Sequence, residues 1–424
     1  MSNTSRYFYQ FSALHALLIG LMPFFIPVLL WQHGVSLAEL SLVIAATGAG
    51  FVLGLMGWEW LRSHRYVSAM IVFSLVAECF LVGFLVFLPQ PLEIHTLLLL
   101  GLLNGLYNCF YWTTQRFFFA ALTAPDPAGQ AQSVTGATFG NFQIVVTVAL
   151  KAGILIGSAL LASETLFILL GFSICVSVLG LISMFRIPQN GLGEVFECPV
   201  ETGYRDIYRF RDACRSRQMF WFDGVFLYLE SYFWILSLYG LTQENVMTLG
   251  ILVVALALIL AVVFYVIKNQ IDRMNQRAVY VGAVAVYALS WWLRGVLDTS
   301  GSTTHLYALV VLIAFLTSFF RLAFNKRFYD IAAQQNTQLF LLAKSYYSQL
   351  GILVFFSAAY VIFLQQGRQT ADFSWLYFGA ALAAVGYLCF RQPAFRINRQ
   401  VPLTVSPSQL NRDEYLTEGD RCEQ

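Results

Sequence analysis

The amino-acid sequence predicts an all-α membrane protein that crosses the bilayer many times, and three observations lead to this prediction. Hydrophobic residues make up 58% of the 424 positions, whereas charged residues make up only 11%. Soluble domains carry roughly 25% charged residues, so a soluble protein of this size would lack polar surface. The apolar residues also occur in runs of about 20, the length that a helix needs to span the hydrocarbon core. Because water is absent there, the backbone of such runs must form helix.

Twelve apolar runs follow one another along the chain, and each is expected to form one transmembrane helix. The first begins at Tyr7 and is too long for the core of a cleaved signal peptide, and it has no small-residue cleavage site. The expected spans cover residues 7–31, 37–60, 67–89, 94–122, 133–161, 164–185, 217–241, 245–267, 278–297, 304–330, 339–365 and 371–391.

Two polar segments divide the chain. Residues 186–216 separate six expected spans from six others, which predicts an N-terminal six-helix bundle at 1–185 and a C-terminal one at 217–391. We expect 186–216 to be a cytoplasmic central linker, in which arginines interleave with apolar residues as in segments held at anionic headgroups. Residues 392–424 form a polar tail that is predicted to be cytoplasmic and disordered.

Basic residues gather on one side of the expected spans. If the N-terminus is cytoplasmic, the inner loops hold most of the lysines and arginines, and the outer side holds little beyond Arg294 and Arg368. Cytoplasmic loops of membrane proteins are enriched in these residues. The sequence therefore predicts an integral protein of the cytoplasmic (inner) membrane with both termini in the cytoplasm.

An internal match supports the division into two halves. Sliding the chain by 211 positions places the run from Gln115 to Phe118 on the run from Lys326 to Tyr329. The match predicts two six-helix pseudo-repeats around a central cavity, which is an architecture of secondary transporters.

At this point the chain resembles the major facilitator superfamily, and the resemblance covers all twelve expected spans. That family carries the loop Gly-x-x-x-Asp-Arg-x-Gly-Arg-Arg between spans 2 and 3. Gly57, Arg62 and Arg65 match this loop, whereas Leu61 and His64 replace its Asp and second Gly.

The resemblance implies a conformational clasp between the bundles, which must break if access is to alternate. Glu59 is expected to replace the missing acid beside Arg62 and Arg65. A second copy of the loop between spans 8 and 9 keeps Asp272 and Arg273. The alternative interpretation is that these residues are ordinary interfacial charges.

Ionisable residues inside the spans are costly and are functional candidates by default. Those placed deep by the sequence are Glu78, Arg116, Lys151, Asp223, Glu230 and Arg321. The resemblance implies that spans 1, 4, 7 and 10 line the central cavity. That ranking favours Arg116, Asp223, Glu230 and Arg321, keeps Lys151 and counts against Glu78.

The two acids of the seventh span are predicted to serve proton coupling. Asp223 and Glu230 are seven residues apart, so they share one helix face about 10 Å apart along the axis. Burial in a low-dielectric cavity favours the protonated form of a carboxyl group, which suits it to carry a proton. Glu230 is the deeper of the two and is the predicted proton site. The alternative is a fixed structural ion pair with Lys151 or Arg321.

The deep cations predict an anionic substrate. Arg116, Lys151 and Arg321 outnumber the two cavity acids, and arginine holds carboxylate or phosphate with two parallel bonds. The alternative is that these cations only neutralise the acids. Lys344 and Arg327 lie near the expected helix ends, where their side chains would snorkel to the surface.

Aromatic and amide side chains are expected to complete the substrate site. Tyr107, Tyr111 and Trp112 would place rings on the cavity wall, and Gln143 is expected to orient a ligand. The alternative role of such an amide is to join helices to one another. Rings of this kind suit a substrate with an apolar body, although packing between helices is the ordinary role of such residues.

The sequence thus predicts a secondary active transporter for a small, anionic, partly apolar organic solute. It is expected to be proton-coupled, with export favoured slightly over import. The alternative is a transporter-like scaffold that assists assembly or biosynthesis without transport. No GxxxxGK[ST] loop is present for ATP, and only five His offer no compact catalytic group, so we do not expect an enzyme.

No cofactor or metal is expected, because the seven Cys form no CxxC pair and no zinc-like spacing with His. The few, scattered charges argue against nucleic acid as a partner. The expected partners are the small-molecule substrate, protons and the lipid bilayer, and the chain is expected to be a monomer.

Overall fold

The computed structural model describes residues 3–64, 66–89, 91–123, 134–186, 203–271, 276–297, 303–366 and 373–391. They belong to one compact unit, Met1–Gln392. Within these ranges every regular element is a helix, which confirms the predicted all-α class. The predicted tail, 392–424, and residues 187–202 of the predicted linker lie outside the described residues.

The N-terminal half begins with a bent helix. Pro23 lacks an amide hydrogen, and the helix breaks there by 40° between Ser5–Leu21 and Pro23–Gln32. The next helix begins at a capping box, in which Ser36 and Glu39 satisfy each other's backbone amides. The elements of this half are α1 (Asn3–Leu21), η1 (Pro23–Phe25), α2 (Ile26–Gln32), α3 (Leu37–Ser63), α4 (Val67–Val86), α5 (Ile94–Thr123), α6 (Val134–Ala162) and α7 (Leu166–Phe185).

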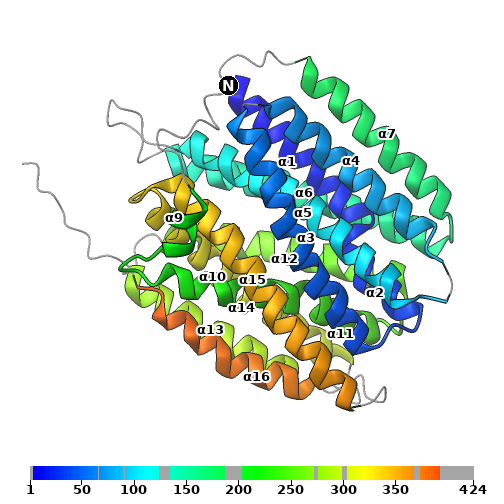
Figure 1. The fold of residues 1–424 in the computed structure, drawn as a ribbon. Helices are drawn as coiled ribbons and strands as arrows, with labels where there is room; N and C mark the ends of the chain where they lie inside the picture. Colours follow the sequence, from blue (N-terminus) through cyan, green and yellow to red (C-terminus); the bar gives the residue numbers. More distant parts are fainter. Residues whose placement is uncertain are drawn as a thin grey trace, which may run out of the picture. The chain divides into compact units, whose positions relative to one another are not determined.

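The C-terminal half begins with a short surface helix and contains one π-helical segment, η2. Figure 1 shows the long helices of both halves running side by side. The elements are α9 (Tyr204–Arg209), α10 (Ser216–Tyr228), η2 (Leu229–Phe233), α11 (Trp234–Leu241), α12 (Val246–Ile271), α13 (Gln276–Gly295), α14 (Thr303–Ala332), α15 (Thr337–Gln366), α16 (Ser374–Ala384) and η3 (Val385–Cys389).

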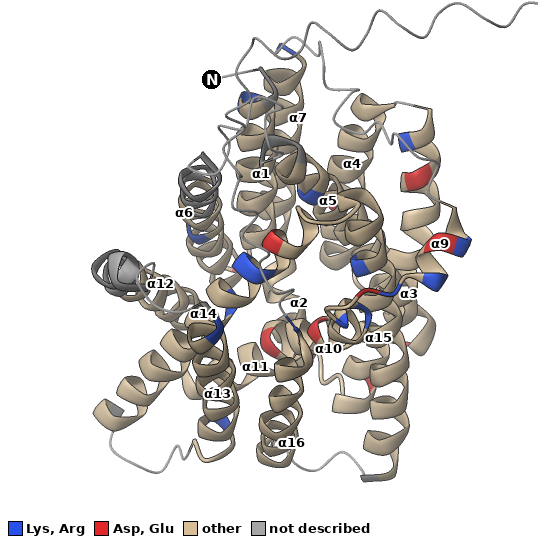
Figure 2. Cartoon of the chain, turned by 90° about the vertical axis from the view of Figure 1, so that its left-hand side faces the viewer, with Lys and Arg blue, Asp and Glu red and all other residues tan. Residues whose placement is uncertain are grey.

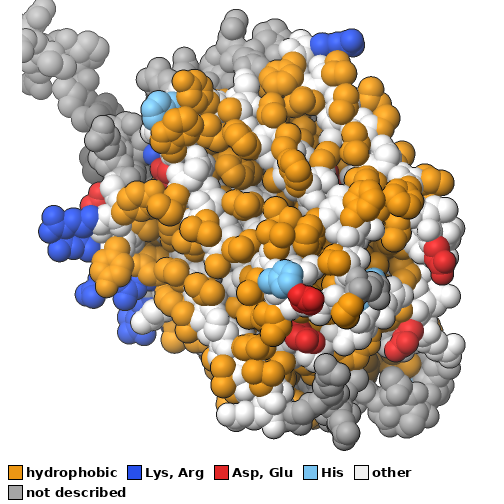
Figure 3. Space-filling view, turned by 45° about the vertical axis from the view of Figure 1, so that its right-hand side comes forward, with side chains coloured by type: hydrophobic (Ala, Val, Ile, Leu, Met, Phe, Trp, Pro, Cys, Tyr) orange, Lys and Arg blue, Asp and Glu red, His pale blue; other side chains and the backbone are white. Residues whose placement is uncertain are grey.

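Each expected span overlaps described helix. By length and composition, eight helices in the described ranges can cross a membrane, or nine if the bent pair at Pro23 is one span. Val246–Ala261 and Ser374–Cys389 are shorter apolar helices. Large hydrophobic side chains are exposed on these helices, Phe80 by 67% and Leu382 by 79% for example. Figure 3 shows hydrophobic side chains covering much of one face, as expected of a surface in lipid. The twelve-span, two-repeat arrangement stays a prediction.

Glycines allow the helices of the N-terminal half to pack with their backbones in close contact. A Cβ atom on Gly105 of α5 would lie 2.2 Å from the Thr47 carbonyl oxygen of α3. Likewise, a Cβ atom on Gly153 of α6 would lie 2.1 Å from the Leu17 carbonyl oxygen of α1. Both glycines belong to Gly-x-x-x-Gly pairs, with Gly101 and Gly157. Small residues at this spacing are the usual means of close helix packing in membranes.

Gly105→Leu is expected to destabilise the protein strongly, because the backbone of α3 already occupies the space that the leucine side chain would need. Overpacking of this kind costs about 1–3 kcal/mol or more. Thermal unfolding of the purified protein in detergent measures the effect. Gly171→Leu is the matched control, since nothing lies within 4 Å of a Cβ atom there. Equal melting temperatures for the two variants would contradict the packing of α3 on α5.

The two halves touch at both ends of the bundle. Gln32, at the end of α2, donates a hydrogen bond of 2.8 Å to the Tyr239 hydroxyl of α11. At the other end of α5, the rings of Phe119 and Tyr329 lie 4.7 Å apart. α3 begins just after α2 and runs parallel to α5. The contact at Gln32 therefore lies near the N-terminal end of α5, and the contact at Phe119 lies near its C-terminal end. The two halves are therefore in contact at both ends of the bundle.

Candidate functional site

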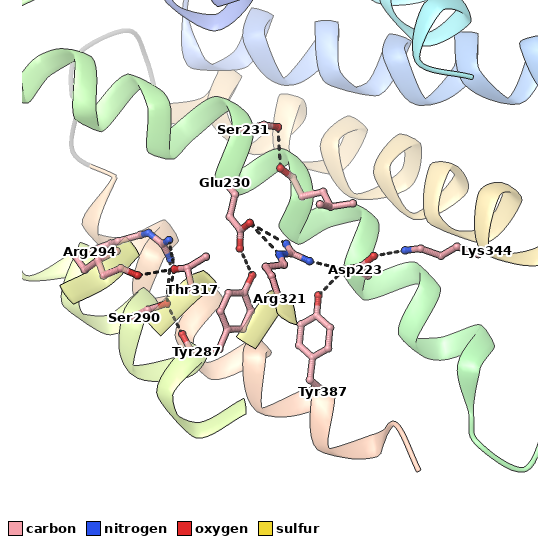
Figure 4. A network of polar contacts seen from close by, with 12 residues as sticks. Asp223, Glu230, Ser231, Tyr287, Ser290, Arg294, Thr317, Arg321, Lys344 and Tyr387 are labelled. Atoms are coloured by element: carbon pink, nitrogen blue, oxygen red, sulfur yellow. Dashed lines mark hydrogen bonds and ion pairs between the residues drawn. The ribbon is translucent and has the colours of Figure 1, made fainter. Parts of the chain in front are cut away.

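A charged network lies in the C-terminal half, centred on Arg321 of α14 (Figure 4). Its Nη1 atom donates to Asp223 Oδ1 at 2.7 Å, and its Nε atom donates to Glu230 Oε2 at 3.1 Å. Its Nη2 atom lies 3.0 Å from the same Glu230 oxygen. The two acids that the sequence placed on one helix face therefore meet on a single guanidinium group.

Three further side chains complete the network. Lys344 of α15 forms an ion pair with Asp223 Oδ2. The Tyr387 hydroxyl donates to Asp223 Oδ1 at 3.3 Å, and the Tyr287 hydroxyl donates to Glu230 Oε1 at 2.5 Å. Every carboxylate oxygen of the pair thus has a donor. Such complete pairing is what permits ionised groups to stay buried, since an unpaired one is very costly.

Glu230 lies on an unusual stretch of backbone. The helix that begins at Ser216 changes to π-helical geometry at Leu229–Phe233 and returns to α-helix at Trp234. Single π-helical turns inside α-helices occur frequently at functional sites. The side chain of Glu230 is 18% exposed, whereas that of Asp223 is only 4% exposed. Glu230 is therefore the more accessible of the two acids.

Arg294 of α13 is buried close to this network without a carboxylate partner among the described residues. Its guanidinium donates to Thr317 Oγ1 at 2.8 Å and to Ser290 Oγ at 3.3 Å. The Cζ atom lies 4.2 Å from the ring centroid of Trp291 and 4.8 Å from that of Trp234. These aromatic faces stabilise a buried cation.

Arg294, which the sequence placed toward the outer side of the membrane, is only 3% exposed. Its side of the membrane stays a prediction. Helical side chains point back toward the N-terminus of their helix, so this long side chain reaches inward from the last turn of α13.

Arg116 of α5 brings a cation from the N-terminal half. Its Nη1 atom donates to Ser345 Oγ at 3.2 Å, next to Lys344 of the network. The charges of Asp223 and Lys344 act on it, but no described carboxylate contacts it. Among the described residues, the network and its surroundings therefore hold four cations, Arg116, Arg294, Arg321 and Lys344, but only two acids.

Lys344 and Arg327 do not snorkel, which corrects the prediction from the sequence. Lys344 is 4% exposed and is bound to Asp223, because α10 and α14 pack against its part of α15. Arg327 is 8% exposed, and its Cζ atom lies 3.7 Å from the ring centroid of Tyr280. It also donates to the carbonyl oxygen of Phe390 at 3.0 Å.

Amide and aromatic groups join the two halves beside the charged network. Asn104 of α5 donates to the Tyr232 hydroxyl of η2 at 3.1 Å. Asn108 donates to Asn104 Oδ1 at 2.9 Å, and the Trp112 indole donates to Asn108 Oδ1 at 3.0 Å. Tyr228 packs against Tyr232 with ring centroids 5.4 Å apart. This chain of groups combines amide side chains with aromatic rings.

The other predicted substrate residues lie elsewhere or are not described. Tyr107 and Tyr111 are fully buried against His15 of α1, inside the N-terminal half. Lys151 of α6 is half-buried and contacts no described polar group. The side chain of Gln143 lies outside the described residues.

The predicted clasp is described only in part. Glu59 and Arg62 form an ion pair of 2.9 Å, but both belong to α3, so this pair does not itself join the bundles. Arg65, Asp272 and Arg273 lie outside the described residues. The clasp therefore stays a prediction.

A separate groove of about 460 Å³ lies among α4, α5 and α7. Apolar side chains such as Leu75, Phe84 and Leu181 line most of it. Beside it, the buried carboxyl group of Glu78 accepts hydrogen bonds from Ser173 and Ser177. The groove contains none of the network residues, so we place the candidate site at the network and not at the groove.

Comparison with known proteins gives a fold. Neither a family model nor a curated protein sequence matches the chain. Among solved structures, the nucleoside transporter NupG matches with a TM-score of 0.62 and 14% identity, over 92% of this chain and 100% of that one. A point variant of NupG matches with the same TM-score and 13% identity, over the same shares.

The chain has the fold of this transporter. This likeness shows the fold, and the superfamily suggested by the sequence stays a resemblance. With its apolar helices, this fold makes the chain an integral membrane protein.

Proposed function

We propose that the chain is a secondary active transporter that moves a small organic anion with an apolar or aromatic body. The observation that carries this proposal is the excess of buried positive charge. Asp223 and Glu230 neutralise Arg321 and Lys344, whereas Arg116 and Arg294 have no carboxylate partner in the described part of the chain. Desolvated cations without a counterion are unfavourable, so an anion bound near Arg116 would stabilise the site.

Proton coupling would operate through Glu230. When Glu230 is ionised, it holds Arg321 by two contacts. When it takes up a proton, it loses its charge and with it most of its attraction for the guanidinium. Arg321 keeps its contact with Asp223, but its Nε and Nη2 atoms are then released to bind the anionic group of a solute together with Arg116. Proton binding and solute binding would therefore favour each other, as uptake of the solute together with a proton requires.

The body of the solute would lie against the groups that join the halves, Trp112, Tyr228 and Tyr232, with Asn104 and Asn108 as hydrogen-bonding groups. A flat ring with polar edges fits such a wall. The fold shared with a nucleoside transporter supports transport as the activity and makes nucleosides and nucleotides sensible first solutes. Movement would proceed by alternating access. Because the proton and the solute bind together in this scheme, an inward proton gradient would drive uptake, and not the export that the sequence slightly favoured.

Solute-driven proton flux in proteoliposomes tests the proposal. The vesicles contain a pH-sensitive dye and receive aromatic carboxylates, nucleoside monophosphates or uncharged nucleosides. We expect flux with anionic solutes and little with uncharged ones. Flux with uncharged nucleosides alone would contradict the anionic substrate. If no solute of the panel moves protons, the alternative of a non-transporting scaffold is favoured.

Arg116→Gln is expected to raise the apparent KM for an anionic solute about 10- to 100-fold, because a hydrogen bond to a charged group contributes about 1.5–3 kcal/mol. Arg116→Lys keeps the charge but loses the planar guanidinium group, so its apparent KM should lie between those of the parent and of Arg116→Gln. Initial transport rates against solute concentration measure the effect. Arg6→Gln, an exposed change on α1, is the control. An unchanged KM in Arg116→Gln would remove Arg116 from the site.

A further inference from the structure

A basic surface lies just before the first long helix of the C-terminal half. It consists of the exposed residues Arg205, Arg209, Arg211 and Arg215, with the exposed rings of Tyr204 and Tyr208. Tyr208 is 79% exposed and Tyr204 is 57% exposed. Figure 2 shows α9 at the edge of the bundle, with basic residues on its ribbon.

The acids within this segment do not neutralise its arginines. Asp206 accepts a hydrogen bond from the backbone amide of Gly203 at 3.2 Å, which caps α9. Asp212 accepts from the backbone amide of Ser216 at 2.8 Å and from its hydroxyl, which caps α10. Among the described residues, none of the four arginines forms an ion pair. The basic surface therefore presents uncompensated guanidinium groups.

The opposite face of the segment is fixed to the protein. Ile207, Phe210 and Cys214 are buried, and the ring of Phe210 lies 6.0 Å from that of Phe340 of α15. The Tyr347 hydroxyl of α15 donates to the carbonyl oxygen of Tyr208 at 2.8 Å. Burial raises the pKa of the Cys214 thiol to about 11, so this residue packs as a neutral thiol. The arginines are thus held on a rigid support.

The basic surface lies at the level where lipid headgroups are expected. The 30 residues of α15 form a helix about 45 Å long, longer than a hydrocarbon core of about 30 Å. Its exposed large hydrophobic residues begin at Val354. Tyr347, which holds α9, is seven residues earlier, or about 10 Å along the axis. The segment therefore lies beside the edge of the apolar band.

We propose that the basic surface binds the phosphate groups of anionic phospholipids. Guanidinium groups match phosphate with parallel hydrogen bonds. Tyrosine is enriched at membrane interfaces, where its ring lies at headgroup level. Each arginine near an anionic membrane surface strengthens binding by about five-fold. The proposal does not depend on transport.

The test uses the full chain purified in detergent and native mass spectrometry of bound phosphatidylglycerol and phosphatidylcholine. The parent is expected to prefer phosphatidylglycerol by at least about ten-fold, and the triple variant R205Q/R209Q/R211Q to lose most of that preference. The control R6Q/R186Q neutralises two exposed arginines away from the segment and should keep it. Higher salt should weaken the preference of the parent.

Three results would overturn the proposal. In the first, the triple variant retains the preference of the parent. In the second, the control loses as much as the triple variant, which would indicate a general charge effect. In the third, millimolar inorganic phosphate displaces phosphatidylglycerol, which would make a soluble anion the ligand. Melting temperatures in phosphatidylcholine check that the variants are folded. If the triple variant unfolds, the single variants R205Q and R209Q are measured in its place, and each is expected to lose a smaller part of the preference for phosphatidylglycerol.

Discussion

Glu230→Gln is expected to abolish proton-driven uphill transport and to leave solute exchange intact. Glutamine has nearly the same shape and can still pair with the Tyr287 hydroxyl, but it exchanges no proton. It also mimics the protonated state in which Arg321 is released for the solute. In proteoliposomes, uphill accumulation driven by a pH gradient should fall to background, whereas counterflow between equal solute pools should persist.

Glu244→Gln is the matched control, because Glu244 is an exposed acid in the turn that follows α11. It should accumulate solute like the parent. Unchanged uphill accumulation in Glu230→Gln would remove Glu230 from proton coupling, and loss of exchange as well would point to a structural role.

Arg321→Gln is expected to destabilise the protein by about 3–5 kcal/mol, the range found when one partner of a buried ion pair is removed. The change leaves Asp223 and Glu230 with Lys344 as the only ion-pairing cation of the network. The double variant Glu230→Gln/Arg321→Gln should recover most of the loss, because Asp223 and Lys344 remain as a matched pair. Thermal unfolding in detergent measures all three proteins.

The same double variant separates the two roles of Arg321. If Arg321 binds the anion, the recovered protein should bind an anionic solute more weakly than the parent. Binding as tight as in the parent would make Arg321 a purely structural partner of Glu230. A stable Arg321→Gln protein would contradict the ion network itself.

The sequence predicted the helices well, because apolar runs of membrane length have few alternatives to helix. The fifth long helix, for instance, was expected at 94–122 and spans Ile94–Thr123. The pairing of Arg321 with Glu230 was also foreseen as one of two interpretations. Close packing at Gly105 was readable from the Gly-x-x-x-Gly spacing, although the sequence interpretation did not use that signal.

The rest of the network was not predictable from sequence position. Lys344 was judged by its distance from a helix end, and that distance says nothing of the helices that cover it. Tyr287 and Tyr387 carry no distinguishing signal among 21 tyrosines, since only tertiary contacts select the two that reach the acids.

The five π-helical residues from Leu229 to Phe233 have the geometry of an α-helix that has gained one residue. One extra residue rotates the two flanking segments relative to each other by about 100°. Loss of one residue there would hardly change the length or hydropathy of the helix. If the part that contains Trp234 kept its place, however, the part that contains Asp223 would rotate and Asp223 would no longer face α14. Related chains that lack this residue are therefore expected to keep an almost identical hydropathy profile while losing the acids that pair with Arg321. Among such relatives, the length of this one helix would record the presence of the charge network.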